Sequence, residues 1–141
     1  MPRSLRVVRI AVTVMAAVFA AVLAGGVLEL LPPDVGYTVG GKAVSRGEWL
    51  RLAAPIFATS AAWFGAAAVG LWTRKPWARF PIIAAFGTVC GFALAGLALG
   101  TFPRDLALRA VIQAAVMGAL SDVYLYHTPV ARYFDALRHP R

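Results

Sequence analysis

The sequence predicts an all-α integral membrane protein, a bundle of four transmembrane helices. Hydrophobic residues make up 60% of its 141 residues and charged residues only 14%, against about 45–50% and about 25% in a typical soluble domain. The apolar residues gather in four long runs, at about 8–31, 50–72, 80–102 and 106–127. Each run is long enough to cross a bilayer as a helix. We therefore expect a single membrane domain over 1–141.

The first run has two interpretations. A basic start, an apolar stretch and Val-Leu-Ala at 22–24 before Gly25 are typical of a secretory signal with a cleavage site. The apolar residues nevertheless continue past that site, to a length that spans a bilayer. This length favours a retained helix, and Pro32 and Pro33 are expected to end it.

The segment between the first two runs predicts a short β-hairpin. Extended pieces at 37–39 and 42–44 flank Gly40 and Gly41, a pair that suits the positive φ angles of a tight turn. Ser45 and Glu48 follow directly, with the spacing of a capping box. The second helix is therefore expected to begin at this point.

Small residues recur at every fourth position of the runs. They are Ala17, Ala21 and Gly25, then Ala54, Ala58, Ala62, Ala66 and Gly70, then Gly87, Gly91 and Ala95, and finally Ala110, Ala114 and Gly118. Residues spaced by four share one face of a helix, and small residues let helices approach closely in lipid. The pattern predicts a tightly packed bundle with these faces turned inward.

The last segment predicts a helix at the membrane surface. Thr128 and Pro129 suit the N-cap and the first position of a helix. Over 129–138, apolar residues fall on one face and charged residues on the other. This pattern is typical of an interfacial amphipathic helix.

The basic residues predict the orientation. Of the 14 Lys and Arg residues, nine lie near the two termini or in the central turn, and five lie on the other side. The positive-inside rule then places both termini in the cytoplasm and the hairpin in the periplasm. The same cytoplasmic side carries the expected membrane-surface anchors: Trp72, Arg74, Lys75, Trp77, Arg79, Tyr133 and Phe134. Because the charges lie at the ends of apolar runs, we expect the lipid bilayer as partner and no nucleic acid.

Four polar residues within or near the runs are candidates for function: Glu29, Arg109, Gln113 and Asp122. Charged groups inside a span are costly and therefore mark functional sites by default. Glu29 and Arg109 lie at the periplasmic ends of their helices, where we expect them to pair. Alternatively, Arg109 pairs with Asp105, one turn earlier.

Asp122 also has two interpretations. It follows the small residues of the fourth run at the same spacing, and is therefore expected to face the bundle. There it either relays protons or binds a cation, or it forms a structural pair with Arg9, Arg79 or a tyrosine hydroxyl. The structural pair is favoured, because the runs offer no second acidic partner for a transport path.

The sequence lacks the residue patterns that several kinds of chemistry require. There is no Cys, His and carboxylate cluster with metal-binding spacing, and no histidine pair placed to hold a haem in the bilayer. No glycine-rich phosphate loop follows a strand, and no Ser or Cys has a placed base. We therefore expect no cofactor, no metal and no enzymatic activity, and we identify no soluble substrate.

Two segments carry a resemblance to a family. Gly-Leu-Trp-Thr-Arg-Lys-Pro-Trp-Ala-Arg at 70–79 and Tyr-Leu-Tyr-His-Thr-Pro-Val-Ala-Arg-Tyr-Phe at 124–134 resemble the central turn and last helix of small, uncharacterised four-helix bacterial membrane proteins, loosely called DoxX-like. The resemblance implies a bacterial inner-membrane setting and no particular activity.

Two functions follow as hypotheses. The first is a non-catalytic accessory or scaffolding subunit that packs against other membrane protein subunits, in a larger complex of the respiratory or photosynthetic type. The shortage of intramembrane chemistry and the small-residue faces favour it. The alternative is a small proton-coupled carrier that uses Asp122.

Overall fold

The computed structural model describes residues 3–30, 36–39 and 42–138, which form helices and one short hairpin. The elements are α1 (Arg3–Val27), β1 (Thr38–Val39), β2 (Lys42–Ala43), α2 (Arg46–Leu52), α3 (Ala54–Trp72), the 3₁₀ helix η1 (Pro76–Ala78), α4 (Arg79–Ala98), α5 (Arg104–Tyr126) and α6 (Pro129–Arg138). Four helical segments, namely α1, α3, η1 with α4, and α5, are long and apolar enough to cross a membrane. The prediction of four such helices is confirmed. The expected helix stop at Pro32 and Pro33 and the turn at Gly40 and Gly41 lie outside the described residues.

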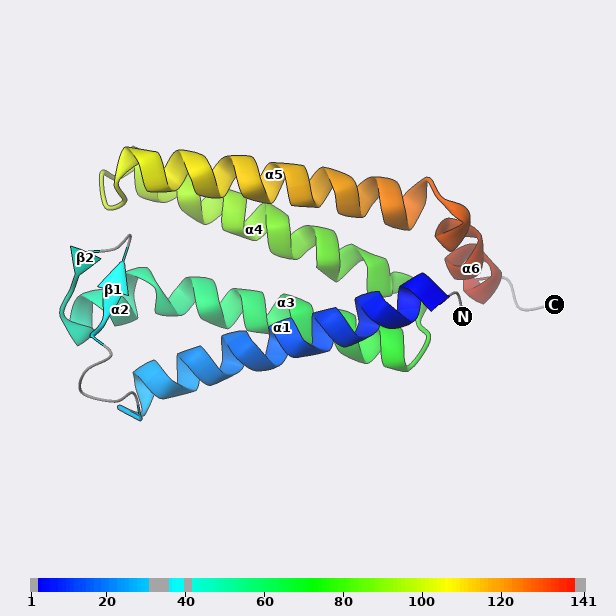
Figure 1. Cartoon of the computed structure of the whole chain (residues 1–141), viewed down its shortest axis with the longest axis horizontal. Helices are drawn as coiled ribbons and strands as arrows, with labels where there is room; N and C mark the ends of the chain where they lie inside the picture. Colours follow the sequence, from blue (N-terminus) through cyan, green and yellow to red (C-terminus); the bar gives the residue numbers. More distant parts are fainter. Residues whose placement is uncertain (1–2, 31–35, 40–41, 139–141) are drawn as a thin grey trace.

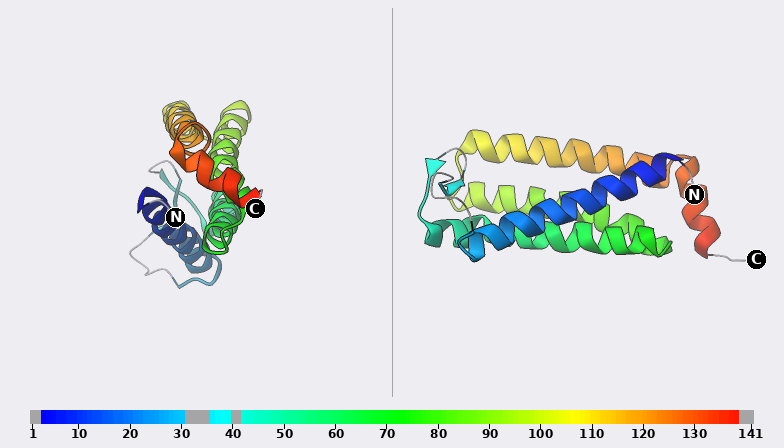
Figure 2. Two further views of the ribbon diagram at one scale, coloured as in Figure 1. Left: turned by 90° about the vertical axis from the view of Figure 1, so that its right-hand side faces the viewer. Right: turned by 60° about the horizontal axis from the view of Figure 1, so that its bottom comes forward.

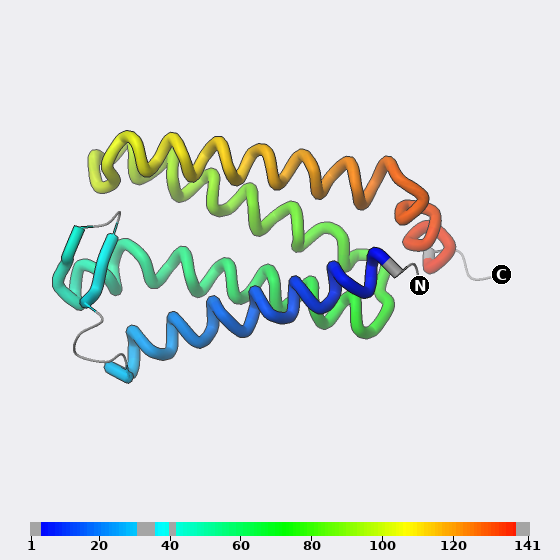
Figure 3. Tube along the Cα trace, viewed as in Figure 1, coloured from blue at the N-terminus to red at the C-terminus, as the bar shows by residue number. Residues whose placement is uncertain are grey.

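The four long helices lie side by side, with both termini at one end and the hairpin at the other (Figure 1). We call these the terminal end and the hairpin end. In chain order each long helix packs against the next, α1 on α3, α3 on α4 and α4 on α5. The chain therefore runs up and down through the four long helices in turn, as its Cα trace shows (Figure 3).

The series of helices does not close into a ring. At the terminal end, Leu5 and Val8 of α1 join the same apolar cluster as Tyr124 and Leu125 of α5. Toward the hairpin end, α1 and α5 separate (Figures 1 and 2). One side of the bundle, between α1 and α5, is consequently open along much of its length.

The hairpin and the start of α2 follow from local sequence signals. Thr38 pairs with Ala43 and Val39 with Lys42 in the antiparallel ladder. Ser45 and Glu48 form the predicted capping box: the Ser45 Oγ accepts a hydrogen bond from the Glu48 N–H at 3.2 Å. In return, the Ser45 N–H donates to the Glu48 carboxylate at 2.9 Å. This bond, followed by a second from the Ser45 hydroxyl, lowers the pKa of Glu48 below its ordinary value.

The second apolar run is two helices and not the single helix we predicted. α2 ends at Leu52 and α3 begins at Ala54, with Pro55 in its first turn. Proline lacks a backbone N–H and clashes with the preceding turn, so a helix breaks most easily there. The hydrogen bonds from Ala53 N–H to Trp49 and from Phe57 N–H to Ala53 continue on either side of the break.

Three helices end in the same backbone motif. The chain turns through a positive φ angle of 57° at Glu29 after α1, 55° at Arg74 after α3 and 66° at Gly100 after α4. The next N–H then returns to a glycine carbonyl five residues back, at Gly25, Gly70 and Gly96, over 3.0, 2.7 and 2.9 Å. This is the Schellman arrangement, which satisfies carbonyls left free at a helix end.

Aromatic side chains form much of the core between α1, α3 and α4. The ring of Phe19 stacks on Phe64 with centroids 5.7 Å apart and also contacts Phe57 at 5.9 Å. Phe64 in turn meets Phe86 of α4 edge-on at 6.1 Å. The indole N–H of Trp63 donates to Thr88 Oγ1 at 3.0 Å and links α3 to α4.

The prediction that the small-residue faces turn inward is wrong for the Gly87 stripe of α4 and for most of the α1 stripe, and it holds only in part for α3. Within these stripes, the exposed positions are Ala17, Ala21, Ala58, Ala62, Gly87, Gly91 and Ala95. Only in α5 does the stripe pack as expected, since Ala114 is buried and Gly118 lies against Phe86 of α4. The large aromatic residues of α1, α3 and α4 occupy the helix interfaces, so the small faces are left on the outside.

Candidate functional site

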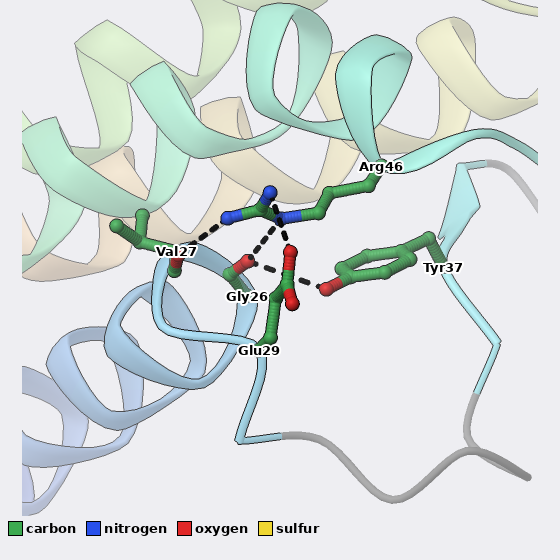
Figure 4. Close-up of polar contacts among 5 residues, drawn as sticks. All are labelled: Gly26, Val27, Glu29, Tyr37 and Arg46. Carbon is green, nitrogen blue, oxygen red and sulfur yellow. Dashed lines mark hydrogen bonds and ion pairs between the residues drawn. The ribbon is translucent and has the colours of Figure 1, made fainter.

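A polar cluster at the hairpin end ties α1 to α2 and the hairpin (Figure 4). Arg46 donates through Nη2 to the carbonyl of Val27 at 2.7 Å and through Nε to the carbonyl of Gly26 at 3.4 Å. Its Nη1 forms an ion pair with Glu29 at 2.7 Å. The Tyr37 hydroxyl donates to the same Gly26 carbonyl at 3.3 Å. A cation at the carbonyl end of a helix is favoured by the helix dipole, so Arg46 stabilises the end of α1.

The expected pair between Glu29 and Arg109 is not formed. Glu29 pairs with Arg46, because α2 and not α5 lies beside the end of α1. Arg109 is exposed on α5, on the far side of the open bundle, and it has no ion pair with any described carboxylate, including Asp105. Glu29 therefore has a structural role in holding the hairpin end together.

A groove lies along the open side of the bundle, where α3, α4 and α5 line it and α1 borders one part of it. Two adjoining hollows of about 470 and 260 Å³ form it, and both are lined by Val89 of α4 and Ala110 of α5. Met15 and Phe19 form its α1 wall, and Val39 of the hairpin borders its outer end. We call this feature the lateral groove. Its lining side chains are apolar except for Thr38 and Gln113, of which Gln113 is the more polar.

Gln113 is a polar side chain near the middle of the long apolar helix α5. It is exposed and lines the lateral groove. Within the described part of the chain, its amide has no side-chain hydrogen bond. Met117, one turn further along, lines the same wall.

Asp122 lies at the terminal end of α5 and does not point into the bundle core as expected. Its side chain is 49% exposed and forms a 3.5 Å contact with Nε2 of His127, an ion pair when this histidine is protonated. The reason is that α4 diverges from α5 toward this end (Figure 1). Neither Arg9 nor Arg79 is its partner, because Arg79 pairs with Asp135 and Arg9 stacks on Trp72.

Two of the seven expected surface anchors are buried. The Arg79 side chain is only 7% exposed, with its guanidinium over the ring of Tyr126 at 4.3 Å and its Nη2 at 3.4 Å from Asp135. Phe134 is 1% exposed. α6 folds across the terminal end, so that it covers Arg79 and turns its own Val130 and Phe134 onto the bundle. The apolar face of α6 therefore covers the helix ends, where we expected it to face lipid.

The remaining expected anchors differ in exposure. Trp72, Arg74, Lys75 and Trp77 are exposed in and around the turn between α3 and α4. Tyr133 is half-buried, and its hydroxyl is one of the buried polar atoms without a hydrogen-bond partner among the described residues. The membrane-surface role of the four exposed residues stays a prediction.

Sequence reasoning missed three of these contacts. It did not foresee that Arg46 and Tyr37 bind the end of α1, nor that Thr88 accepts from Trp63. The contact of Arg46 could have been expected from the sequence. A basic residue at the start of one helix can donate hydrogen bonds to the free carbonyls at the end of the helix before it. Across the described ranges, no three His, Cys, Asp or Glu side chains gather as a metal site.

Comparison with protein-family models, with curated proteins and with solved structures gives no match to this chain. The resemblance of segments 70–79 and 124–134 to DoxX-like proteins therefore stays an expectation.

Proposed function

We propose that the protein is a non-catalytic accessory or scaffolding subunit of a larger membrane protein complex. In this proposal the four long helices cross the bacterial inner membrane, with both termini in the cytoplasm and the hairpin in the periplasm. The distribution of basic residues supports this orientation.

The exposed surface supports insertion into a membrane. Only 6% of the most apolar part of α1 and 11% of that of α5 are buried, against 33% for α3. The exposed faces carry large apolar side chains, for example Ile10 and Val14 of α1 and Ile112 and Val116 of α5. Soluble monomers rarely expose contiguous apolar surface on this scale, whereas hydrocarbon is a favourable environment for it.

Gln113 is the observation that carries the proposal of a partner. In hydrocarbon no water satisfies an exposed amide, and burying one without a hydrogen bond costs roughly 2–7 kcal/mol. A polar side chain of this kind in a transmembrane helix usually bonds across to a neighbouring helix. No described residue of this chain forms a side-chain hydrogen bond with Gln113. A helix of another subunit in the lateral groove would supply this hydrogen bond.

Other features of the open side fit a helical partner. The lateral groove runs along the bundle from the larger hollow, beside Gln113, to the smaller hollow, beside the hairpin. The exposed Gly87 and Gly91 of α4 leave a second face on which a helix backbone can approach closely. Neither feature identifies the partner, which is expected to be a respiratory or photosynthetic complex.

The test is recovery of the tagged protein from its native membrane in mild detergent, followed by mass spectrometry of the material that comes with it. We expect a stoichiometric larger complex with the wild-type chain. Gln113→Leu removes an interhelical hydrogen bond of about 1–2 kcal/mol and should weaken association roughly 5- to 30-fold. Met117→Leu is the matched control, because it changes an apolar side chain on the same wall of the groove.

The stability of the isolated protein separates the two explanations of a lost complex. Gln113→Leu replaces an exposed amide by an apolar group, so the purified variant should be as stable in detergent as wild type. Recovery of the wild-type protein from its native membrane without any other subunit contradicts the proposal. So does a Gln113→Leu variant that retains its complex as firmly as Met117→Leu.

A further inference from the structure

A stacked pair of side chains joins α1 and α3 at the terminal end. The Arg9 guanidinium lies over the indole ring of Trp72, with 3.7 Å between its carbon and the ring centroid. The Trp72 Nε1–H donates to Thr13 Oγ1 at 3.2 Å, and this hydroxyl donates in turn to the Arg9 carbonyl at 2.8 Å. The ring is therefore held by a hydrogen bond, and the guanidinium carbon lies over its face at the distance of a cation–π contact.

The hydrogen-bond donors of Arg9 are unused. Its Nε is buried and has no hydrogen-bond partner, and no described residue accepts from either terminal nitrogen. A guanidinium carries five N–H donors in a planar fork. A buried donor without an acceptor costs roughly 1–3 kcal/mol, so the geometry favours an acceptor that is absent from the described chain.

The surroundings are strongly cationic. Arg6 lies one turn before Arg9 on α1, and Arg74 and Lys75 come two and three residues after Trp72; all three are exposed. The described carboxylates of this end are engaged elsewhere, Asp122 by His127 and Asp135 by Arg79. The missing acceptor is therefore expected to be an anion that the described residues do not supply.

We propose that Arg9 and Trp72 form a binding site for the phosphate of an anionic phospholipid. A phosphate matches the planar fork of a guanidinium with two parallel hydrogen bonds. Trp72 is 54% exposed at the end of an apolar helix, where an indole ring lies at the level of the lipid headgroups. Arg6, Arg74 and Lys75 add attraction for a negatively charged lipid surface. The site depends on the proposed membrane insertion but is independent of the partner complex.

The test uses the purified full-length chain in nonionic detergent. Binding of brominated phosphatidylglycerol is measured by quenching of tryptophan fluorescence, with brominated phosphatidylcholine of the same chain length as the zwitterionic comparison. We expect tighter binding of phosphatidylglycerol. Arg9→Gln, which removes the charge and the fork, should lower its affinity about tenfold, the equivalent of one good charge-assisted contact.

Three further variants make the result specific. Arg9→Lys keeps the charge but loses the planar fork and most of the stacking, so it should lose most of the same affinity. Arg51→Gln removes an exposed arginine from α2 at the hairpin end and should change nothing. Trp72→Phe should reduce the maximal quenching, because it removes the fluorophore nearest the bound lipid.

Several outcomes overturn the proposal. Equal affinities for the two lipids exclude an anionic headgroup site, and an unchanged Arg9→Lys variant reduces the effect to diffuse charge attraction. Displacement of phosphatidylglycerol by inorganic phosphate at equal concentration indicates a site for free phosphate and not for a lipid. If Arg9→Gln fails to fold, the comparison of Arg9→Lys with wild type decides alone. None of these results depends on whether a partner complex exists.

Discussion

The contact between α3 and the following turn makes Gly70→Ala a sharp test of the structure. A Cβ atom on Gly70 would lie 2.7 Å from the Cβ and 3.0 Å from the Cα of Ala78, and 3.0 Å from Trp77 Cζ3. Ala78 has no rotatable side chain and is fully buried, so relief requires the backbone of η1 to move away from α3. Overpacking of this kind costs about 1–3 kcal/mol.

The matched control is Gly87→Ala in α4. A Cβ atom there would meet no heavy atom within 4 Å, so only helix propensity changes, in favour of alanine by up to about 1 kcal/mol. Both substitutions carry the same propensity gain, which cancels when the two variants are compared. The difference between their unfolding free energies in mixed micelles should therefore be about 1–3 kcal/mol, with Gly70→Ala the less stable.

A second variant locates the clash. Gly70→Ala combined with Ala78→Gly removes the closest of the three contacts, and we expect it to recover part of the lost stability relative to the two single variants. If Gly70→Ala is as stable as Gly87→Ala, the close approach of α3 and η1 is refuted, and with it the packing of the central turn.

Two further predictions concern the carboxylates. The lowered pKa of Glu48 means that its carboxylate binds a proton less tightly in the folded chain than in the unfolded chain. The ionised carboxylate therefore stabilises the fold at pH values above its ordinary pKa. This stabilisation is lost as the pH falls through the lowered pKa. Glu48→Gln should flatten this part of the profile of unfolding midpoint against pH, and parallel profiles for the two proteins would count against the capping box. Asp122→Asn, by contrast, should change stability by less than about 1 kcal/mol, because both partners of the Asp122 and His127 pair are well exposed. In proteoliposomes we expect no proton-coupled flux that depends on Asp122, and a flux that Asp122→Asn abolishes would establish the carrier alternative.

The positions of the helices could be predicted because they depend on local signals. Pro129 begins α6 where expected, and the capping box of Ser45 and Glu48 begins α2. The break at Ala53 was missed although Pro55 signals it, because an apolar run alone does not distinguish one helix from two. Local chemistry also gave the hairpin, whose described strands pair as predicted.

The neighbours of each helix could not be predicted in the same way. A small-residue stripe shows where a backbone can approach closely, but it does not show which helix approaches, or whether any helix of the same chain does. Hydrophobicity gives no help, since in a membrane protein both the core and the lipid-facing surface are apolar. The stacking of Phe19, Phe57 and Phe64 decides the α1 and α3 interface, and it left Ala17 and Ala21 outside.

The same limit explains which candidate residues were placed correctly. Depth along a helix follows from the sequence, so Glu29 was expected at the hairpin end, and it is found there. Its partner depends on which helix is adjacent, and five basic residues, among them Arg46 and Arg109, lie at that end. Arg46, on the adjacent helix, pairs with the carboxylate, and Arg109 stays exposed on α5. Gln113 and Arg109, which have no side-chain partner among the described residues, thus lie on α5, the helix that the bundle covers least after α1. The proposed partner helix is therefore expected to carry its own polar or acidic groups at the levels of Gln113 and Arg109.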